Sequence, residues 1–279
     1  MSAPPADTML EPTVRITEIF HSIQGESSRV GLPTVFVRLT GCPLRCSWCD
    51  TEYAFTGGEA ISIEEILARV TELNCRTVCV TGGEPLAQKS CVPLLTALCD
   101  AGYSVSLETS GALDIGKADP RVSRIVDLKA PGSGEDSKNR WANLELLTAL
   151  CDAGYSVSLE TSGALDIGKV DPRVSRIVDL KAPGSGEDSK NRWANLDLLT
   201  AHDELKLVLA SRADYNWAVA ACRQRRLFAT EGGRCEILFS PVQGQLAPAD
   251  LAQWIIDDQL PVRFQLQLHK VLWGSSPGR

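Results

Sequence analysis

The feature that most constrains the fold is an internal repeat in the middle of the chain. Residues 94–149 recur at 146–201, at an offset of 52 residues. Only two positions differ between the copies, Ala118 against Val170 and Glu145 against Asp197. Repeats that stack into solenoids usually diverge further and occur at least three times. We therefore interpret the repeat as a recent tandem duplication or an assembly error, with a functional two-repeat architecture as the alternative.

The domain organisation follows once the repeat is discounted. The 279 residues, less one copy of 52, have the size of one ordinary domain. We predict a flexible N-terminal tail over residues 1–12, where two prolines adjoin, and a single domain over 13–279. That domain contains both copies of the repeat, 94–145 and 146–197.

Composition and charge exclude several classes of protein. Hydrophobic residues make up 44% and charged residues 23%, as in ordinary globular domains. The net charge of −7 argues against a broad basic face for nucleic acid. No apolar run approaches the roughly 20 residues that span a bilayer, and the start has no signal-peptide pattern. We expect a cytoplasmic protein with no direct nucleic-acid or membrane partner.

Short β-rich segments alternate with helical segments, which predicts an α/β fold with a mostly parallel sheet or barrel. The predicted strands are 14–19, 34–39, 77–81, 104–108, 124–128, 204–209, 236–239 and 263–268, with 156–160 and 176–180 in the second copy. Helices are predicted from Ser62, which forms a capping box with Glu65, and over 93–101 and 249–257.

Polar, glycine-rich motifs follow many of these strands. They occupy residues 22–26, 40–42, 81–85, 108–111, 128–134 and 239–241. The C-terminal ends of the strands carry the active site in parallel barrels. We therefore expect these motifs to meet on one rim of the sheet.

Three of the ten cysteines, Cys42, Cys46 and Cys49, have the spacing C-x3-C-x2-C. Without an export signal, reduced thiols are expected rather than disulfides. Three thiolates leave one iron of a cubane 4Fe–4S cluster without a protein ligand, and a cofactor can bind there. A structural zinc site normally needs a fourth ligand, and the nearest histidine, His21, has no usual zinc spacing. A zinc knuckle or a chance cysteine-rich loop is the alternative.

With Trp48 before the last cysteine and Gly82-Gly83-Glu84-Pro85 further on, the chain resembles the radical S-adenosylmethionine superfamily. Within it, the chain resembles the 7-carboxy-7-deazaguanine synthase family. The motifs that carry this second resemblance are residues 23–26, Arg38, 49–51, 108–111 and 267–270. The resemblance implies an incomplete or modified (β/α) barrel of the radical S-adenosylmethionine type, with the 52-residue duplication in its middle.

The activity that the resemblance implies is a ring contraction. A radical derived from S-adenosylmethionine converts 6-carboxy-5,6,7,8-tetrahydropterin to 7-carboxy-7-deazaguanine with release of ammonia, in queuosine and 7-deazapurine biosynthesis. The family implies a homodimer, Mg2+ as a further cofactor, and a reductant protein that the sequence does not identify. Two alternatives remain open: another radical S-adenosylmethionine enzyme, such as a glycyl-radical activating enzyme, or a metal-binding protein inactivated by the duplication.

The resemblance also assigns residues to the cofactors. Cys42, Cys46 and Cys49 would ligate the cluster, and Thr51 matches a threonine that binds Mg2+. Gly83 would contact S-adenosylmethionine, because a glycine permits close backbone approach. The remaining contacts would come from Asp127, Leu128 and Lys129 or from the second-copy equivalents Asp179, Leu180 and Lys181. Without the resemblance, Thr51 would be interpreted as a helix cap and the glycines as an ordinary turn.

The residues that the resemblance places at the substrate are Ile23, Gln24, Gly25, Arg38, Thr81 and Glu108. A glutamine amide can pair with the donor and acceptor edge of a pterin, and an arginine fork suits two carboxylate oxygens. A surface ion pair is the alternative for Arg38, and a cap or turn role is the alternative for Glu108.

Only one copy of the repeated segments fits a barrel of the family's size. We favour the first copy for 108–111, because its connection from the preceding strand is short and intact. Between 127–129 and 179–181 the sequence does not decide. We expect the surplus segment to lie outside the barrel, poorly covered, rather than to widen the barrel with all its strands.

Overall fold

The computed structural model describes residues 12–25, 29–47, 49–129, 133–155 and 157–266, with the single positions 268, 272 and 274. Nearly all of the predicted tail lies outside the described residues, and so does Trp48. Of the predicted motif at 267–270, only Leu268 is described.

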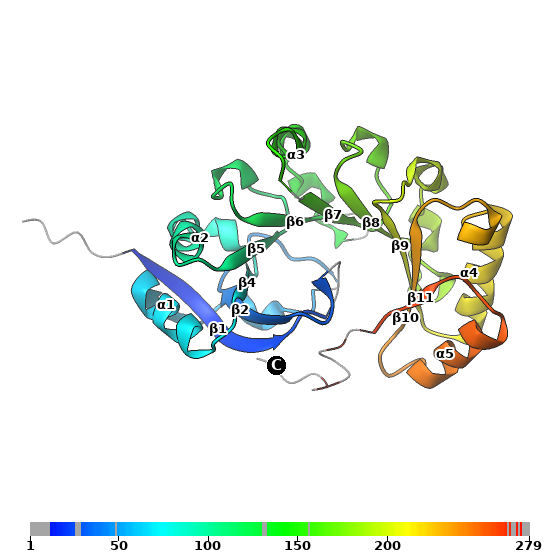
Figure 1. Cartoon of the computed structure of the whole chain (residues 1–279), viewed down its shortest axis with the longest axis horizontal. Coiled ribbons are helices and arrows are strands. Elements are labelled where there is room, and N and C mark those ends of the chain that lie inside the picture. Colours follow the sequence, from blue (N-terminus) through cyan, green and yellow to red (C-terminus); the bar gives the residue numbers. More distant parts are fainter. Residues whose placement is uncertain are drawn as a thin grey trace, which may run out of the picture.

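The described strands form one mostly parallel sheet, which confirms the predicted α/β class. Their order is β11-β10-β9-β8-β7-β6-β5-β4-β2-β1-β3. In chain order they are β1 (Thr13–Ile23), β2 (Pro33–Leu39), β3 (Glu59–Ser62), β4 (Thr77–Gly82), β5 (Ser104–Thr109), β6 (Ser123–Leu128), β7 (Val157–Thr161), β8 (Ser175–Asp179), β9 (Glu204–Leu209), β10 (Glu236–Pro241) and β11 (Arg263–Phe264). Only the pairings of β1 with β2 and β3 are antiparallel. Figure 1 shows the sheet curved into an open arc, with helices on its outer side.

The α-helices are α1 (Ile63–Glu72), α2 (Cys91–Asp100), α3 (Ala142–Asp152), α4 (Arg212–Gln224) and α5 (Pro248–Asp257). Short 3-10 helices lie at Glu52–Ala54, Pro85–Ala87, Ile115–Lys117, Asp136–Lys138, Ile167–Lys169, Pro183–Ser185, Asp188–Lys190, Trp193–Leu198 and Ala229–Glu231. The predicted cap of α1 is confirmed, because Ser62 Oγ accepts a hydrogen bond of 3.1 Å from the Glu65 amide. No helix in the described part of the chain is long and apolar enough to cross a membrane.

Both copies of the repeat contribute strands to the sheet. The first copy supplies β5 and β6, and the second supplies β7 and β8, which lie between β6 and β9. The expectation that the surplus segment lies outside the sheet is therefore wrong. The physical reason is burial: Val126 and Leu128 of the first copy share one apolar cluster with Leu147, Val157 and Leu159 of the second. Expelling β7 and β8 would expose that apolar surface to water.

The two copies do not fold identically, although their sequences are almost the same. In the first copy, the segment that starts at Trp141 leads into the α-helix α3. In the second copy, the equivalent segment forms the 3-10 helix Trp193–Leu198. Arg176, at 3% exposure, forms a buried ion pair of 2.5 Å with Asp203. Its equivalent Arg124 instead donates to the carbonyls of Val122 and Ala118 at 2.8 and 2.7 Å. The sequence beyond the second copy supplies a partner that the first copy lacks.

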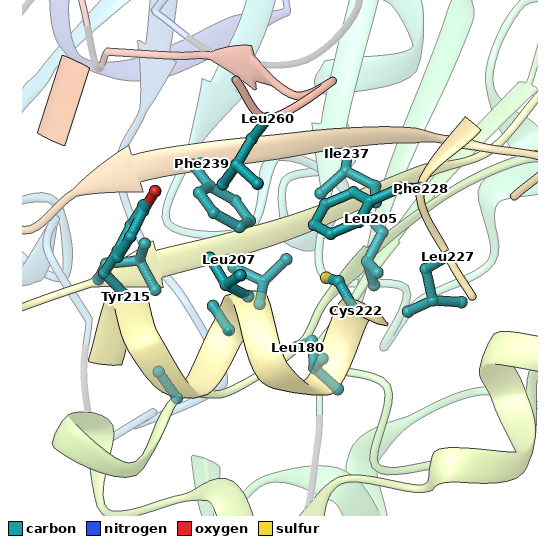
Figure 2. Close-up of a cluster of buried hydrophobic side chains, with 14 of the residues drawn as sticks. Leu180, Leu205, Leu207, Tyr215, Cys222, Leu227, Phe228, Ile237, Phe239 and Leu260 are labelled. Carbon is teal, nitrogen blue, oxygen red and sulfur yellow. The ribbon is translucent and has the colours of Figure 1, made fainter. Parts of the chain in front are cut away.

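The largest apolar cluster lies around the strands from the C-terminal part of the chain, β8 to β10. Figure 2 shows α4 packed on β9 and β10, with Tyr215, Phe228 and Phe239 among the buried side chains. Leu180 belongs to this cluster and is 3% exposed. A predicted cofactor-binding residue of the second copy is thus a core residue.

We predict that deletion of residues 146–197 leaves a protein that folds cooperatively with a sheet two strands narrower. Residues 124–128 and 176–180 are identical, so β6 can pair with β9 as β8 does now. Arg124 would then meet Asp203 as Arg176 does. Far-UV circular dichroism and urea unfolding measure the outcome, and loss of a cooperative transition would contradict it.

Candidate functional site

A cavity of about 450 Å³ lies at the C-terminal ends of β2 and β4 to β7 and along β1. Because β1 is antiparallel to β2, its C-terminal end lies at the opposite edge of the sheet, so the motif that begins at residue 22 reaches the cavity but not the predicted rim. Most of the predicted site residues line this cavity: Ile23, Gln24, Gly25, Arg38, Cys42, Cys46, Cys49, Thr51, Thr81, Gly83, Glu108, Asp127 and Lys129. The side chain of Leu128 does not line it, because it is buried in the cluster on the helix side. Among the described residues, the predicted rim motif at 239–241 does not line it either.

The loop that carries the cysteines follows β2 and is held by the loop after β6. The amide of Arg45 donates to Glu135 Oε1 at 2.6 Å, and the amide of Ser47 donates to the Ser133 carbonyl at 3.2 Å. The Arg45 guanidinium lies over the Phe55 ring, 4.3 Å from its centroid. The contacts with Ser133 and Glu135 fix the cysteine loop against the first copy of the repeat. The equivalent residues of the second copy, Ser185 and Glu187, instead line a separate cavity of about 220 Å³.

The three cysteines are free thiols that face the cavity from this loop. Burial raises the pKa of the Cys42 and Cys46 thiols, and the positive charge of Lys129 acts against this rise in both. The lysine therefore favours the thiolate forms, which are the forms that bind metal. Three partly exposed thiols on one cavity wall fit a cluster with one open iron. No three His, Cys, Asp or Glu side chains of the described residues gather closely enough for a single metal ion.

The paired glycines at the end of β4 pack directly on the cysteine loop. A Cβ on Gly82 would stand 2.3 Å from the Leu39 carbonyl oxygen. A Cβ on Gly83 would stand 2.4 Å from the Gly41 carbonyl oxygen and 2.8 Å from Cys42 Cβ. The sequence predicts that Gly83 permits close approach of a cofactor. In the structure, the backbone that approaches these glycines is the protein's own, so any side chain here would displace the cysteine loop.

Glu84 links the glycine motif to the end of β5, and sequence reasoning gave it no role of its own. Its carboxylate is fully buried, at 0% exposure. It accepts hydrogen bonds from Thr109 Oγ1 at 2.9 Å, Ser110 N at 2.8 Å and Ser110 Oγ at 2.6 Å. The second copy has no such anchor, and Ser162 Oγ is buried without a hydrogen-bond partner among the described residues. The sequence feature that distinguishes the two copies here is that Glu84 precedes the repeat and therefore has no duplicate.

Glu108 lines the cavity and connects two other predicted residues. Its two carboxylate oxygens accept hydrogen bonds from Gln24 Nε2 and Thr81 Oγ1, each at 3.0 Å. Three predicted substrate residues, from β5, β4 and the segment after β1, are thereby joined in one network. The predicted cap or turn alternative for Glu108 does not describe these contacts.

Arg38 is held by three residues that the sequence did not reveal. Its Nε donates to Glu18 Oε1 at 2.7 Å, and its guanidinium carbon lies 5.8 Å from the centroids of the Phe20 and Tyr53 rings. Tyr53 OH donates to the same carboxylate at 2.9 Å, and burial raises the pKa of Tyr53 to about 12. Glu18 therefore orients Arg38, and the rest of the fork remains on the cavity wall.

The remaining predicted residues are Thr51, which precedes the repeat, and the equivalent segments of the two copies. Thr51 Oγ1 donates to Asp50 Oδ1 at 2.7 Å, and both line the cavity, whereas no capping bond from Thr51 is formed. Asp127 and Lys129 form an ion pair on the cavity wall. Their duplicates Asp179 and Lys181 pair in the same way at 2.5 Å but do not line this cavity. The structure thus brings the first-copy segment to the cysteines.

We predict that Glu84→Gln lowers the free energy of unfolding by about 2–4 kcal/mol, because an amide NH2 would face donors that now meet a buried carboxylate. Urea unfolding measures the change. Glu145→Gln is the matched control, since Glu145 is exposed on α3, and it should cost less than about 0.5 kcal/mol. Equal effects of the two substitutions would contradict the anchoring role.

Comparison with known proteins finds a matching family model and similar proteins. The family model of the radical SAM superfamily matches residues 36–129. The chain is 40% identical over 264 residues to a 7-carboxy-7-deazaguanine synthase of Chlorobaculum tepidum, covering 95% of this chain and 96% of the relative. It is 38% identical over 274 residues to the enzyme of the same name from Koribacter versatilis, covering 93% and 97%. The crystal structure of QueE from Escherichia coli is similar at 21% identity and a TM-score of 0.46, covering 91% of this chain and 93% of that one.

Proposed function

The chain belongs to the 7-carboxy-7-deazaguanine synthase family of radical S-adenosylmethionine enzymes, and we propose from its cavity how its residues carry that activity. The reaction is the conversion of 6-carboxy-5,6,7,8-tetrahydropterin to 7-carboxy-7-deazaguanine with release of ammonia. One observation carries the proposal: a single cavity joins three free thiols to the network of Gln24, Thr81 and Glu108 and to Arg38.

The thiol side of the cavity is the cofactor side of the proposed enzyme. Cys42, Cys46 and Cys49 would hold a 4Fe–4S cluster and leave one iron open. When bound, the cluster with S-adenosylmethionine supplies a 5′-deoxyadenosyl radical that removes one substrate hydrogen. Gly83 and the Asp127–Lys129 ion pair line the same wall and would border the cofactor. Leu128 contributes to the core instead.

The opposite side of the cavity would bind the pterin. Glu108 keeps lone pairs on both oxygens beyond those used by Gln24 and Thr81, so it can accept from the pterin N–H groups. Ile23 and Gly25 border the same edge. Arg38 would pair with the substrate carboxylate, because Glu18 already occupies its Nε and orients the fork. The network therefore positions the substrate before the radical forms.

Further elements of the proposal follow from the family and from the oxygen atoms at the cavity wall. Thr51 and Asp50 would hold Mg2+ together with waters and substrate, since this ion prefers oxygen ligands and retains waters. The arc of the sheet would be an incomplete barrel around the bound substrate. We further propose a cytoplasmic homodimer that receives its electron from a separate reductant protein.

We predict that replacing Cys42, Cys46 or Cys49 by Ala abolishes both the cluster and turnover. Loss of one thiolate leaves a second iron without a protein ligand. Iron and sulfide analysis after anaerobic reconstitution, and product formation from the carboxypterin with S-adenosylmethionine and reductant, measure the two effects. Replacing Cys99 and Cys151, which lie in α2 and α3 away from the cavity, is the control and should leave the cluster intact. Bound zinc without sulfide in the parent protein would contradict the proposal.

We predict that Arg38→Lys lowers use of the carboxypterin at least tenfold more than it lowers uncoupled cleavage of S-adenosylmethionine, an effect on the order of 1.4 kcal/mol. Lysine keeps the charge but loses the planar fork and the Nε contact with Glu18. Chromatographic assay of 7-carboxy-7-deazaguanine and 5′-deoxyadenosine separates the two activities. Equal losses would place Arg38 at the cofactor or in the scaffold.

A further inference from the structure

The tandem repeat changes the neighbour of one carboxylate on the cavity wall. In the second copy, Asp179 pairs in register with Lys206 of β9. In the first copy, the equivalent Asp127 pairs in register with Glu160 of β7. Because the sequences around the two aspartates are identical, a sheet with one copy would place Lys206 beside its aspartate. The duplication therefore puts a glutamate where a single-copy sheet would have a lysine.

Glu160 belongs to the same cavity as the proposed cofactor residues. It lines the cavity together with Asp127 and Lys129, whereas the flanking residues of β7, Leu159 and Thr161, are buried. Paired strands run about 4.8 Å apart and their residues in register share a face, so the two carboxylates are adjacent on this wall. Lys129 pairs with Asp127, and Glu160 adds a further negative charge beside that pair.

The position of Glu160 indicates whether it can contact the proposed substrate or the proposed cofactor. The proposed pterin residues come from β1, β2, β4 and β5, whereas Glu160 comes from β7, the strand farthest from them among those that line the cavity. In the proposed function, the methionine end of S-adenosylmethionine would bind the open iron beside the cysteines. Its adenosine end would then lie along the rest of the cavity wall that carries Asp127 and Lys129. An ionised carboxylate is an acceptor only, and the ribose hydroxyls are donors. Acidic side chains bind ribose hydroxyls in other nucleotide sites for the same reason.

We propose that Glu160 accepts a hydrogen bond from the ribose hydroxyls of S-adenosylmethionine, as a binding residue that the duplication adds to this chain. The inference rests on the proposed function, since it requires the cofactor to occupy this cavity. A charge-assisted hydrogen bond is about twice as strong as a neutral one, so the carboxylate form of this side chain matters for affinity.

Equilibrium binding tests the proposal without turnover. Isothermal titration calorimetry of the anaerobically reconstituted protein would use S-adenosylhomocysteine and its 2′,3′-dideoxyribose analogue. Glu160→Gln should weaken binding of S-adenosylhomocysteine about fivefold or more and leave binding of the dideoxy analogue unchanged. Asp179→Asn is the control, because Asp179 is the second-copy equivalent of Asp127 and lies outside the cavity, and it should leave both affinities unchanged.

Each outcome bears on one statement. Unchanged affinity of Glu160→Gln for S-adenosylhomocysteine would overturn the inference while the proposed function stands. Equal weakening for both ligands would also overturn it, because the effect would not involve the hydroxyls. Failure of the reconstituted parent protein to bind S-adenosylhomocysteine would overturn the proposed function and this inference with it.

Discussion

The site depends on the close approach of two backbones, the end of β4 and the cysteine loop that follows β2. The Gly83 amide donates to the Leu39 carbonyl at 3.2 Å, and the Glu84 amide donates to the Gly41 carbonyl at 2.8 Å. Only glycines fit at positions 82 and 83, because a Cβ on Gly82 or Gly83 would overlap backbone atoms of Leu39 or Gly41. The approach turns the Glu84 side chain inward, where it binds the end of β5. The cysteines, the glycine turn and Glu108 are thereby fixed relative to one another.

The same contact explains why two nearly identical segments are not equivalent. Glu84 and the cysteine loop occur once, before the repeat, and they meet the first copy. The second copy meets neither, so Ser162 Oγ is left without a partner among the described residues and Lys181 lies at a separate cavity. Proximity along the chain decides this, because β4 continues directly into α2 and β5. A segment acquires its role from the partners it contacts rather than from its own sequence.

Much of the fold and site could be predicted because the signals are local. Strand periodicity indicated most of the sheet, and the cysteine spacing and paired glycines indicated the residues at one rim. Predictions failed where distant partners decide. Helix α4 is an exception, because it was missed although the Ser211 cap and the helical spacing of its buried Tyr215, Ala218 and Cys222 are local signals. Both the partner of Arg176 and the position of β7 within the sheet depend on residues far along the chain. The contacts that Glu18 and Tyr53 make with Arg38 are likewise tertiary.

The two extra strands also divide the molecule into a site half and a supporting half. Among the described residues, the cavity wall ends at Glu160 on β7, and no residue of β8 to β11 reaches it. The predicted rim motif at 239–241 forms the end of β10, which is separated from β6 by three strands, so it lies too far around the arc to contribute. The large apolar cluster beneath β9 and β10 then stabilises the sheet without touching the site. On the cavity wall the second copy places Glu160 beside Asp127, where a sheet with one copy would place Lys206, so the duplication changes the charged groups of this wall and leaves the anchored first copy intact.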